Sequence, residues 1–170
     1  MNQDVKIRFA TPSDIPLILQ FIKELAEYEQ LLHEVVATEE QLLETLFGSK
    51  SYAEVIIGYL DEKPVSFALF FHNYSTFLGK PGLYLEDLYV KPEARGHGIG
   101  QIMLAYLAKL AKNRNCGRFE WWVLDWNEPA IKFYERIGAK PMDEWTVYRV
   151  SGKALNELAD KYTQFSPLKV

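Results

Sequence analysis

The sequence predicts a mixed α/β (α+β) domain, a sheet with helices on its faces. Runs rich in aliphatic and aromatic residues alternate with stretches whose apolar residues recur three and four positions apart. The order of these segments is β-α-α-β-β-β-α-β-α-β-α, which is typical of helices packed on one sheet. The length of 170 residues suits one domain. We therefore expect residues 1–170 to form a single domain, with a C-terminal tail at about 151–170.

The N-terminal quarter predicts one strand and two helices. Lys6–Phe9 alternates polar and apolar residues, which indicates a half-buried strand. The following helix is expected to run to about residue 29, with Ser13 as its N-cap, because Pro16 then lies in the first turn. Thr38–Gln41 forms a capping box, which predicts the start of a second, shorter helix.

The middle of the chain predicts most of the sheet. A polar loop is expected at 72–76 and a helix at 99–112. Four segments rich in apolar and aromatic residues predict strands, at 52–59, 65–71, 83–90 and 118–124.

The C-terminal part predicts a helix, a strand and a second helix. Asn127 and Pro129 begin the first helix, with proline in its first turn, and Gly138 ends it. The segment 142–150 is strand-like, and a final helix is expected at 153–161.

Composition argues against several classes of partner. The net charge of −4 argues against nucleic acid, which needs a basic surface. Cys116 is the single cysteine, so an internal disulfide is impossible, and it and the three histidines are scattered without metal-ligand spacing. No apolar stretch reaches the ~20 residues that span a bilayer, and Met1–Asp4 is polar, unlike a signal peptide. We expect a cytoplasmic protein without metal or membrane partner.

A glycine loop, Arg95–Gly100, connects the expected strand at 83–90 to the expected helix at 99–112. Such a loop at a helix N-terminus presents several backbone N–H groups to a phosphate. Gln101 and Met103 stand where a dinucleotide-binding G-x-G-x-x-G would need its last glycine, and the loop does not supply the G-x-x-x-x-G-K-[ST] pattern either. The loop therefore predicts a phosphorylated ligand of another kind.

Three segments in this order resemble the GCN5-related N-acetyltransferase (GNAT) superfamily: Tyr84–Asp87, Arg95–Gly100 with its Arg-x-x-Gly-x-Gly pattern, and Val123–Tyr134. Within it they look like the diamine (spermidine/spermine) and thialysine acetyltransferases, over about residues 5–150. The resemblance implies a mixed, mostly antiparallel twisted sheet of about six to seven strands with helices on both faces. It also implies acetyl-CoA as the cofactor and a homodimer, with Trp145–Val170 near the partner.

The resemblance also implies which residues hold the cofactor. The loop amides would meet the pyrophosphate, Arg95 would add charge, and backbone groups of Leu88 and Val90 would contact the pantetheine arm. Asn127 and Ala130 would flank the other side of the cofactor. The full set of expected cofactor-binding residues is Leu88, Tyr89, Val90, Arg95, Gly96, His97, Gly98, Ile99, Gly100, Gln101, Asn127 and Ala130.

Two residues are candidates for proton transfer. Glu86 is the candidate base, acting through an ordered water, because an alkyl ammonium with a pKa near ~10.4 must lose its proton before attack. Tyr134 is the candidate acid for the leaving thiolate, with Phe133 on another face of the helix and able to enter the core. The alternatives are a solvated strand-end acid at Glu86 and a packed core tyrosine at Tyr134.

The substrate residues follow from the same resemblance. Asp87 points to the opposite face of a regular strand from Glu86, and either recognises the substrate or supports the structure. Spermidine/spermine enzymes carry an acid where Ser75 stands, so we favour a small amine related to thialysine or lysine over a long polyamine. The expected substrate-binding residues are Tyr28, Glu29, Ser75, Glu86, Asp87 and Glu120.

The resulting hypothesis is acetyl transfer from acetyl-CoA to a primary amine of a small molecule, by direct attack in a ternary complex. Two alternatives stay open from the sequence. One is an acetyltransferase that acts on a protein or peptide amine. The other is a non-catalytic sensor that binds acyl-CoA.

Overall fold

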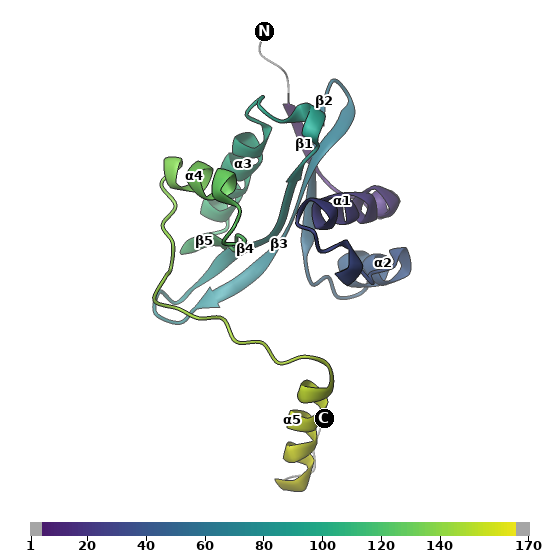
Figure 1. Ribbon diagram of the computed structural model, residues 1–170, viewed down its shortest axis with the longest axis vertical. Coiled ribbons are helices and arrows are strands. Elements are labelled where there is room, and N and C mark those ends of the chain that lie inside the picture. The colour runs from purple at the N-terminus through teal and green to yellow at the C-terminus, as the bar shows by residue number, and fades with distance from the viewer. Residues whose placement is uncertain (1–4, 166–170) are drawn as a thin grey trace. The chain divides into compact units, whose positions relative to one another are not determined.

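The computed structural model describes residues 5–165. The chain divides into two compact units, one up to Trp122 and one from Val123 onward. The first contains the sheet and three α-helices, and the second contains two further helices (Figure 1). The expectation of one domain over 1–170 stays a prediction. The expectation about Met1–Asp4, and the part of the tail at 166–170, lie outside the described residues.

The sheet of the first unit has five strands in the order in which they occur along the chain. The first four pair antiparallel, and the fifth runs parallel to the fourth. This confirms the predicted mixed, mostly antiparallel α/β class, although five strands form among the described residues instead of six or seven. The strands are β1 (Val5–Phe9), β2 (Glu54–Leu60), β3 (Lys63–Ser75), β4 (Lys80–Val90) and β5 (Arg118–Trp121).

Three predictions about the strands are wrong. The strand expected at 118–124 ends at Trp121. The polar loop expected at 72–76 is largely strand, because Asn73 and Tyr74 pair with Gly82 and Pro81 across a hairpin. The expected strand at 142–150 does not form. Its apolar alternation is real, but Trp145 and its apolar neighbours are exposed, and extended backbone becomes a strand only when a neighbouring strand pairs with it.

Helices cover both faces of the sheet, as predicted. Figure 1 shows α1 (Ile15–Tyr28) and α2 (Glu39–Phe47) on one face and α3 (Ile99–Asn113) on the other. Neighbouring residues of a strand point to opposite faces, so the apolar run in β2 fills both cores. The core on the α1 face consists of Ile15, Ile18, Phe21, Leu42, Leu46, Val55, Ile57, Phe67 and Tyr89.

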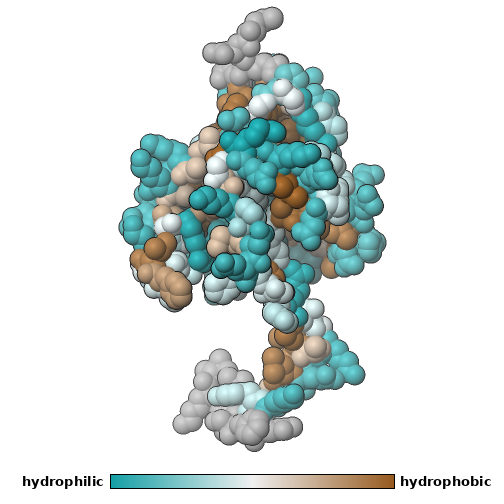
Figure 2. Space-filling view, turned by 60° about the vertical axis from the view of Figure 1, so that its left-hand side comes forward, coloured by the Kyte–Doolittle hydropathy of each residue, from teal (hydrophilic) through white to brown (hydrophobic). Residues whose placement is uncertain are grey.

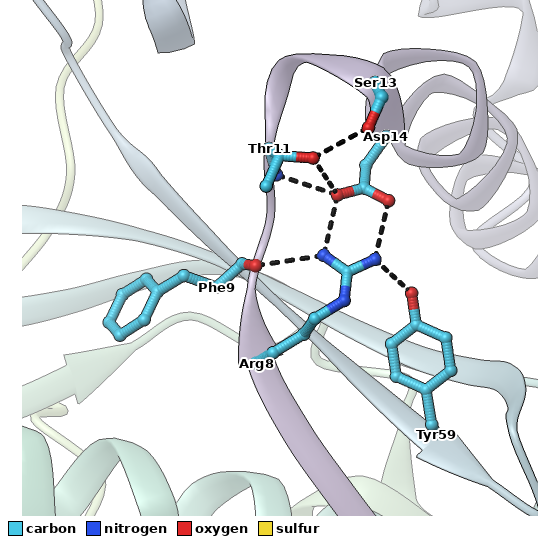
Figure 3. A network of polar contacts seen from close by, with 6 residues as sticks. All are labelled: Arg8, Phe9, Thr11, Ser13, Asp14 and Tyr59. Carbon is cyan, nitrogen blue, oxygen red and sulfur yellow. Dashed lines mark hydrogen bonds and ion pairs between the residues drawn. The ribbon is translucent and has the colours of Figure 1, made fainter.

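The start of α1 is fixed by Asp14 instead of the predicted cap Ser13. The Asp14 carboxylate accepts two hydrogen bonds of 2.8 Å from the Arg8 guanidinium and one of 2.7 Å from the Thr11 N–H (Figure 3). Thr11 and Asp14 form a capping box around the short 3-10 turn Pro12–Asp14 that precedes α1. The Ser13 hydroxyl instead pairs with the Thr11 hydroxyl at 2.8 Å. Asp14 takes the capping position because its charge also pairs with Arg8.

The predicted capping box of α2 is confirmed. The Gln41 N–H donates to the Thr38 hydroxyl at 3.2 Å, and the Gln41 side chain accepts from the Thr38 N–H at 3.0 Å. This exchange satisfies two backbone donors that the first turn of a helix otherwise leaves unpaired.

The second unit contains α4 (Glu128–Arg136) and α5 (Gly152–Phe165). The side chain of Asn127 caps α4 by accepting from the Ala130 N–H at 3.4 Å, and Pro129 lies in the first turn, as predicted. Between residues 5 and 165, none of the helices is both long and apolar enough to cross a membrane.

Candidate active site

A β-bulge in β4 removes Glu86 from the regular pairing of the sheet. Leu85 pairs with Phe70 on β3, but Asp87 pairs with Leu69, so Glu86 is one extra residue in the register. The Glu86 side chain is exposed. A bulge of this kind bends a strand and redirects the side chains that follow it. The prediction of a regular strand at 83–90 is therefore wrong at Glu86.

The bulge decides which face of the sheet Asp87 occupies. Its partner Leu69 packs against the core on the α1 face, and Tyr89, two residues further, lies in that core with its ring edge against Phe21. In a regular strand Leu85 would share this face with Tyr89, but Leu85 pairs with Phe70 on the opposite face. Asp87 therefore lies on the face that α1 covers.

The pairing of β4 with β5 ends beside the bulge. Gly82–Leu85 pairs with Arg118–Trp121, and in the described structure no strand pairs with the Glu86–Val90 edge on that side. This edge contains Leu88 and Val90, whose backbone groups were expected to contact the cofactor. An extended ligand requires backbone donors and acceptors of this kind.

Three carboxyl groups create a negative site at this point. Burial raises the pKa of Asp87 to about 7, and repulsion from the Glu86 and Glu29 carboxylates adds to the effect. Burial also raises the pKa of Glu29, which follows the last residue of α1. Over residues 5–165, no three Asp, Glu, His or Cys side chains converge to hold a metal ion. Carboxyl groups gathered in this way attract a positive charge.

The glycine loop begins α3 with the geometry that anion binding needs. Gly96 and Gly98 have φ values of 81° and 75°, a left-handed conformation that favours glycine, and Gly98 is the N-cap of α3. A Cβ at either glycine would have no atom within 4 Å, so the space in front of the backbone is open. Ile99 is buried and anchors the helix start, while the first-turn N–H groups lack helical acceptors. These residues fit a pyrophosphate.

The side chain of Arg95 has a different environment from the one expected. Its Nε donates to the Val90 carbonyl oxygen at 2.9 Å, and its guanidinium carbon lies 4.9 Å from the centre of the Tyr28 ring. It also lies 5.6 Å from the centre of the Tyr89 ring. This contact between the loop and α1 was not predicted, since residues this far apart in sequence give no local signal of contact.

Other expected site residues lie elsewhere or already have partners. Ser75 is buried at the hairpin end of β3, where its hydroxyl accepts from the Leu78 N–H at 3.3 Å. Ser75 pairs with Lys80, at the opposite end of β4 from Asp87, so the structure does not bring it to the carboxyl cluster. The Glu120 carboxylate lies 2.8 Å from the Nε of Arg118 and accepts a hydrogen bond of 3.0 Å from the side-chain amide of Asn73. The ion pair with Arg118 offsets the negative charge that Glu120 was expected to offer to the substrate.

The expected acid, Tyr134, lies on α4 in the second unit and is half-buried. Its ring centre lies 5.5 Å from that of Phe133. Phe133 is also only half-buried, so the expectation that it enters a core is not met. In the first unit His97 turns back toward the Ala94 carbonyl at 3.4 Å, and the Gln101 side chain is exposed on the first turn of α3.

Comparison with protein families gives one match that covers most of the chain. The model of the Acetyltransferase (GNAT) family matches residues 19–139. This range includes the bulge, the glycine loop and α4.

Two curated relatives and one solved structure are similar over nearly their whole length. A thialysine N-epsilon-acetyltransferase of Sus scrofa is 38% identical over 168 residues, covering 92% of this chain and 98% of that protein. An L-ornithine N5-acetyltransferase of Arabidopsis thaliana is 33% identical over 198 residues, covering 90% and 87%. An integron cassette protein of V. cholerae superposes with a TM-score of 0.77 at 30% identity, covering 91% of this chain and 97% of that one.

Proposed function

The chain belongs to the GNAT acetyltransferase family, and from this premise we propose that it moves the acetyl group of acetyl-CoA to a primary amine of a small molecule, by direct attack in a ternary complex. The family membership makes it an N-acetyltransferase and implies an acyl-CoA donor. The choice of amine and the roles of single residues are the proposal.

The observation that carries the proposal is the carboxyl cluster Glu29, Glu86 and Asp87 beside the bulge. A primary amine with a pKa near ~10.4 arrives as an ammonium ion, which this negative site attracts. The relatives are named for thialysine and ornithine, two amino acids with a distal primary amine. We therefore favour an amino acid of this type as the acceptor.

We assign the proton acceptor to Asp87, with Glu86 as the exposed carboxylate that attracts the ammonium. Transfer of a proton from an amine of pKa ~10.4 to a carboxylate of pKa about 7 is uphill by roughly 3 pKa units. This gap is smaller than it would be if Asp87 had its ordinary pKa, and on this ground we favour Asp87 over the Glu86 base expected from the sequence.

On the donor side, we propose that the N–H groups of Gly98, Ile99 and Gly100 hold the pyrophosphate of acetyl-CoA, whose thioester supplies an activated acetyl group. The open space at Gly96 and Gly98 and the N-terminus of α3 support this assignment. Tyr134 is proposed to donate its phenol proton to the leaving thiolate, as the resemblance of the segment 123–134 implies.

We also propose a homodimer that forms through the second unit. Figure 2 shows hydrophobic side chains on one side of α5. Among the residues of this helix, Leu155, Leu158 and Tyr162 are each about half exposed. Trp145 and Tyr148, in the extended segment before α5, are more exposed still. Apolar surface of this extent is typical of a protein interface.

An amine panel tests the proposed function. Release of CoA is measured with thialysine, ornithine, lysine, spermidine and a lysine-containing peptide, and mass spectrometry locates the acetyl group. We expect the highest kcat/KM with one of the amino acids, acetylated on its distal amine. Comparable rates on the peptide would contradict the small-amine proposal, and binding of acetyl-CoA without turnover on any amine would indicate a sensor.

A further inference from the structure

We propose that Arg95 is a positioning residue that couples the glycine loop, where acetyl-CoA is proposed to bind, to the carboxyl cluster, where the amine is proposed to bind. It does so by holding Tyr28 at the end of α1 against the start of the glycine loop. The inference rests on the proposed function for its substrates. Its geometry, however, belongs to the first unit alone. It predicts that binding at the loop changes the order of the end of α1, and with it the affinity for the amine.

The first step is the environment of the guanidinium. The guanidinium carbon of Arg95 lies over two aromatic rings from different elements, 4.9 Å from the centre of the Tyr28 ring and 5.6 Å from that of the Tyr89 ring. The planar guanidinium stacks on aromatic faces, an attraction of cation and π-electrons. The hydrogen bond from Nε to the Val90 carbonyl oxygen at 2.9 Å fixes the direction of the side chain.

The two rings differ in how firmly the fold holds them. Tyr89 is 6% exposed and packs edge-on against Phe21 in the core, so its ring is held in place. Tyr28 is 40% exposed and is the last residue of α1, where helices fray. Arg95 thus joins an exposed helix end to a fixed part of β4.

The end of α1 matters because Glu29 follows Tyr28 directly. Glu29 contributes to the field at Asp87, where the amine is proposed to bind. A displacement of Tyr28 therefore changes the position of one of the three carboxyl groups. Arg95 in turn is adjacent to Gly96, so a ligand that orders the loop amides also orders the backbone of Arg95.

Coupling of this kind is reciprocal: if acetyl-CoA strengthens the binding of the amine by some factor, the amine strengthens the binding of acetyl-CoA by the same factor. The structure supplies a direct readout in the backbone bonds that end α1. The N–H of Glu29 donates to the Leu25 carbonyl oxygen at 2.9 Å, and the N–H of Leu31 donates to the Ala26 carbonyl oxygen at 2.7 Å. Hydrogen exchange of these amides reports the order of the helix end without any amine present.

The main experiment measures this exchange in the full chain with and without CoA. In the wild type we expect saturating CoA to slow exchange of the Glu29 and Leu31 amides by about 5-fold or more, within the usual range of coupling. In Arg95→Met, which keeps the aliphatic stem without the charge, CoA still binds but the effect at these amides is lost. An equal effect of CoA in both proteins, or none in the wild type, would overturn the proposal.

A double-mutant cycle on the amine supplies a second test. Arg95→Met and Tyr28→Leu are each expected to raise the KM for the amine about 5- to 10-fold, with kcat and the Kd for CoA within about 3-fold. The double variant should be no worse than either single one, and Tyr28→Phe, which keeps the ring, should restore the wild-type KM. Additive effects would contradict a shared contact. Loss of CoA affinity alone would make Arg95 a donor-site residue.

Two matched controls separate positioning from general support of the fold. Arg8 lies 5.1 Å from the centre of the Tyr59 ring and Lys50 lies 5.0 Å from that of Tyr52, both remote from the loop in sequence. Arg8→Met should lower Tm and leave the exchange effect of CoA unchanged, and Lys50→Met should change neither. If the wild type acetylates no amine, the proposed function fails, and the exchange experiment still decides the role of Arg95.

Discussion

Asp87 on β4 and Glu29 at the end of α1 lie close enough for their carboxyl groups to repel one another. The bulge at Glu86 creates this relationship, because it turns Asp87 onto the face of the sheet that α1 covers. A group that is buried and also faces two other acids keeps its proton to a higher pH than a solvated carboxyl group. The fold thus prepares a carboxyl group that titrates near neutral pH.

This burial predicts an unusual dependence of stability on pH. The pKa of Asp87 is raised in the folded protein to about 7, above its ordinary value of 3.8, so its contribution is fully present below about pH 4 and is lost as pH rises to about 7. The loss is on the order of a few kcal/mol. Urea unfolding from pH 4 to 8 should show it, and Asp87→Asn should flatten this part of the profile. An unchanged profile in Asp87→Asn would contradict the raised pKa.

At Asp14 the stability of the fold is expected to depend on pH in the opposite direction and in a more acidic range. Hydrogen bonds from Arg8 lower the pKa of Asp14 from 3.8 to about 2, so its contribution is present above about pH 4 and is lost as pH falls toward 2. Asp14→Asn should lower the free energy of unfolding at pH 7 by about 2 kcal/mol. The solvent-facing turn residue Asp61 offers the control Asp61→Asn, for which we expect less than about 0.5 kcal/mol. Equal effects of the two substitutions would contradict this account of the N-terminus.

Gly98→Ala tests the assignment of the loop. The left-handed backbone at residue 98 costs a non-glycine residue about 1–2 kcal/mol, and the new methyl group enters the space proposed for the pyrophosphate. We expect the Kd for acetyl-CoA to rise about 10-fold or more, measured by calorimetry.

Gly79→Ala is the control for Gly98→Ala, since Gly79 has a φ of 61° and equally open surroundings in the β3–β4 hairpin. It should cost similar stability and leave the affinity for acetyl-CoA unchanged. If both variants bind acetyl-CoA like the wild type, the loop is not the pyrophosphate site.

Tyr134→Phe tests the proposed acid. Loss of the phenol proton should reduce kcat by roughly 10²-fold and leave acetyl-CoA binding nearly intact. Steady-state kinetics and calorimetry on the same preparation measure both quantities. Tyr52→Phe, at an exposed tyrosine ahead of β2, should change neither. Wild-type turnover in Tyr134→Phe would remove this residue from the mechanism.

Much of the fold follows from the sequence because its local signals agree with its tertiary packing. The capping box at Thr38 and the apolar face of α1 carry their information within a few residues, and both form as predicted. The segment 142–150 is a case in which the local pattern predicted a strand that does not form. Its alternation matches a strand, but pairing depends on a neighbour that the segment itself does not encode.

The site was predicted less completely for the same reason. Short motifs contain the glycine loop, the two acids Glu86 and Asp87, and Asn127, so the sequence places these residues on the right elements. The bulge at Glu86 has no local signal, because Leu85, Glu86 and Asp87 read as a regular strand, and the choice between the two acids depended on it. The stacking of Arg95 on Tyr28 joins segments that are remote in sequence, so only the fold reveals it.

The pH dependence of kcat/KM for Asp87→Asn, beside Glu86→Gln and the wild type, tests the central claim most directly. If Asp87 accepts the proton of the amine, kcat/KM of the wild type rises about tenfold per pH unit up to a break at about pH 7, and Glu86→Gln shows the same break at a lower pH because it loses the repulsion from Glu86. Asp87→Asn should lack this break, so that its kcat/KM keeps rising with the fraction of neutral amine, and should lose about 10²-fold or more in rate at pH 7, with Tm measured alongside. If Asp87→Asn keeps the break and Glu86→Gln loses it, Glu86 is the base and the claim is wrong.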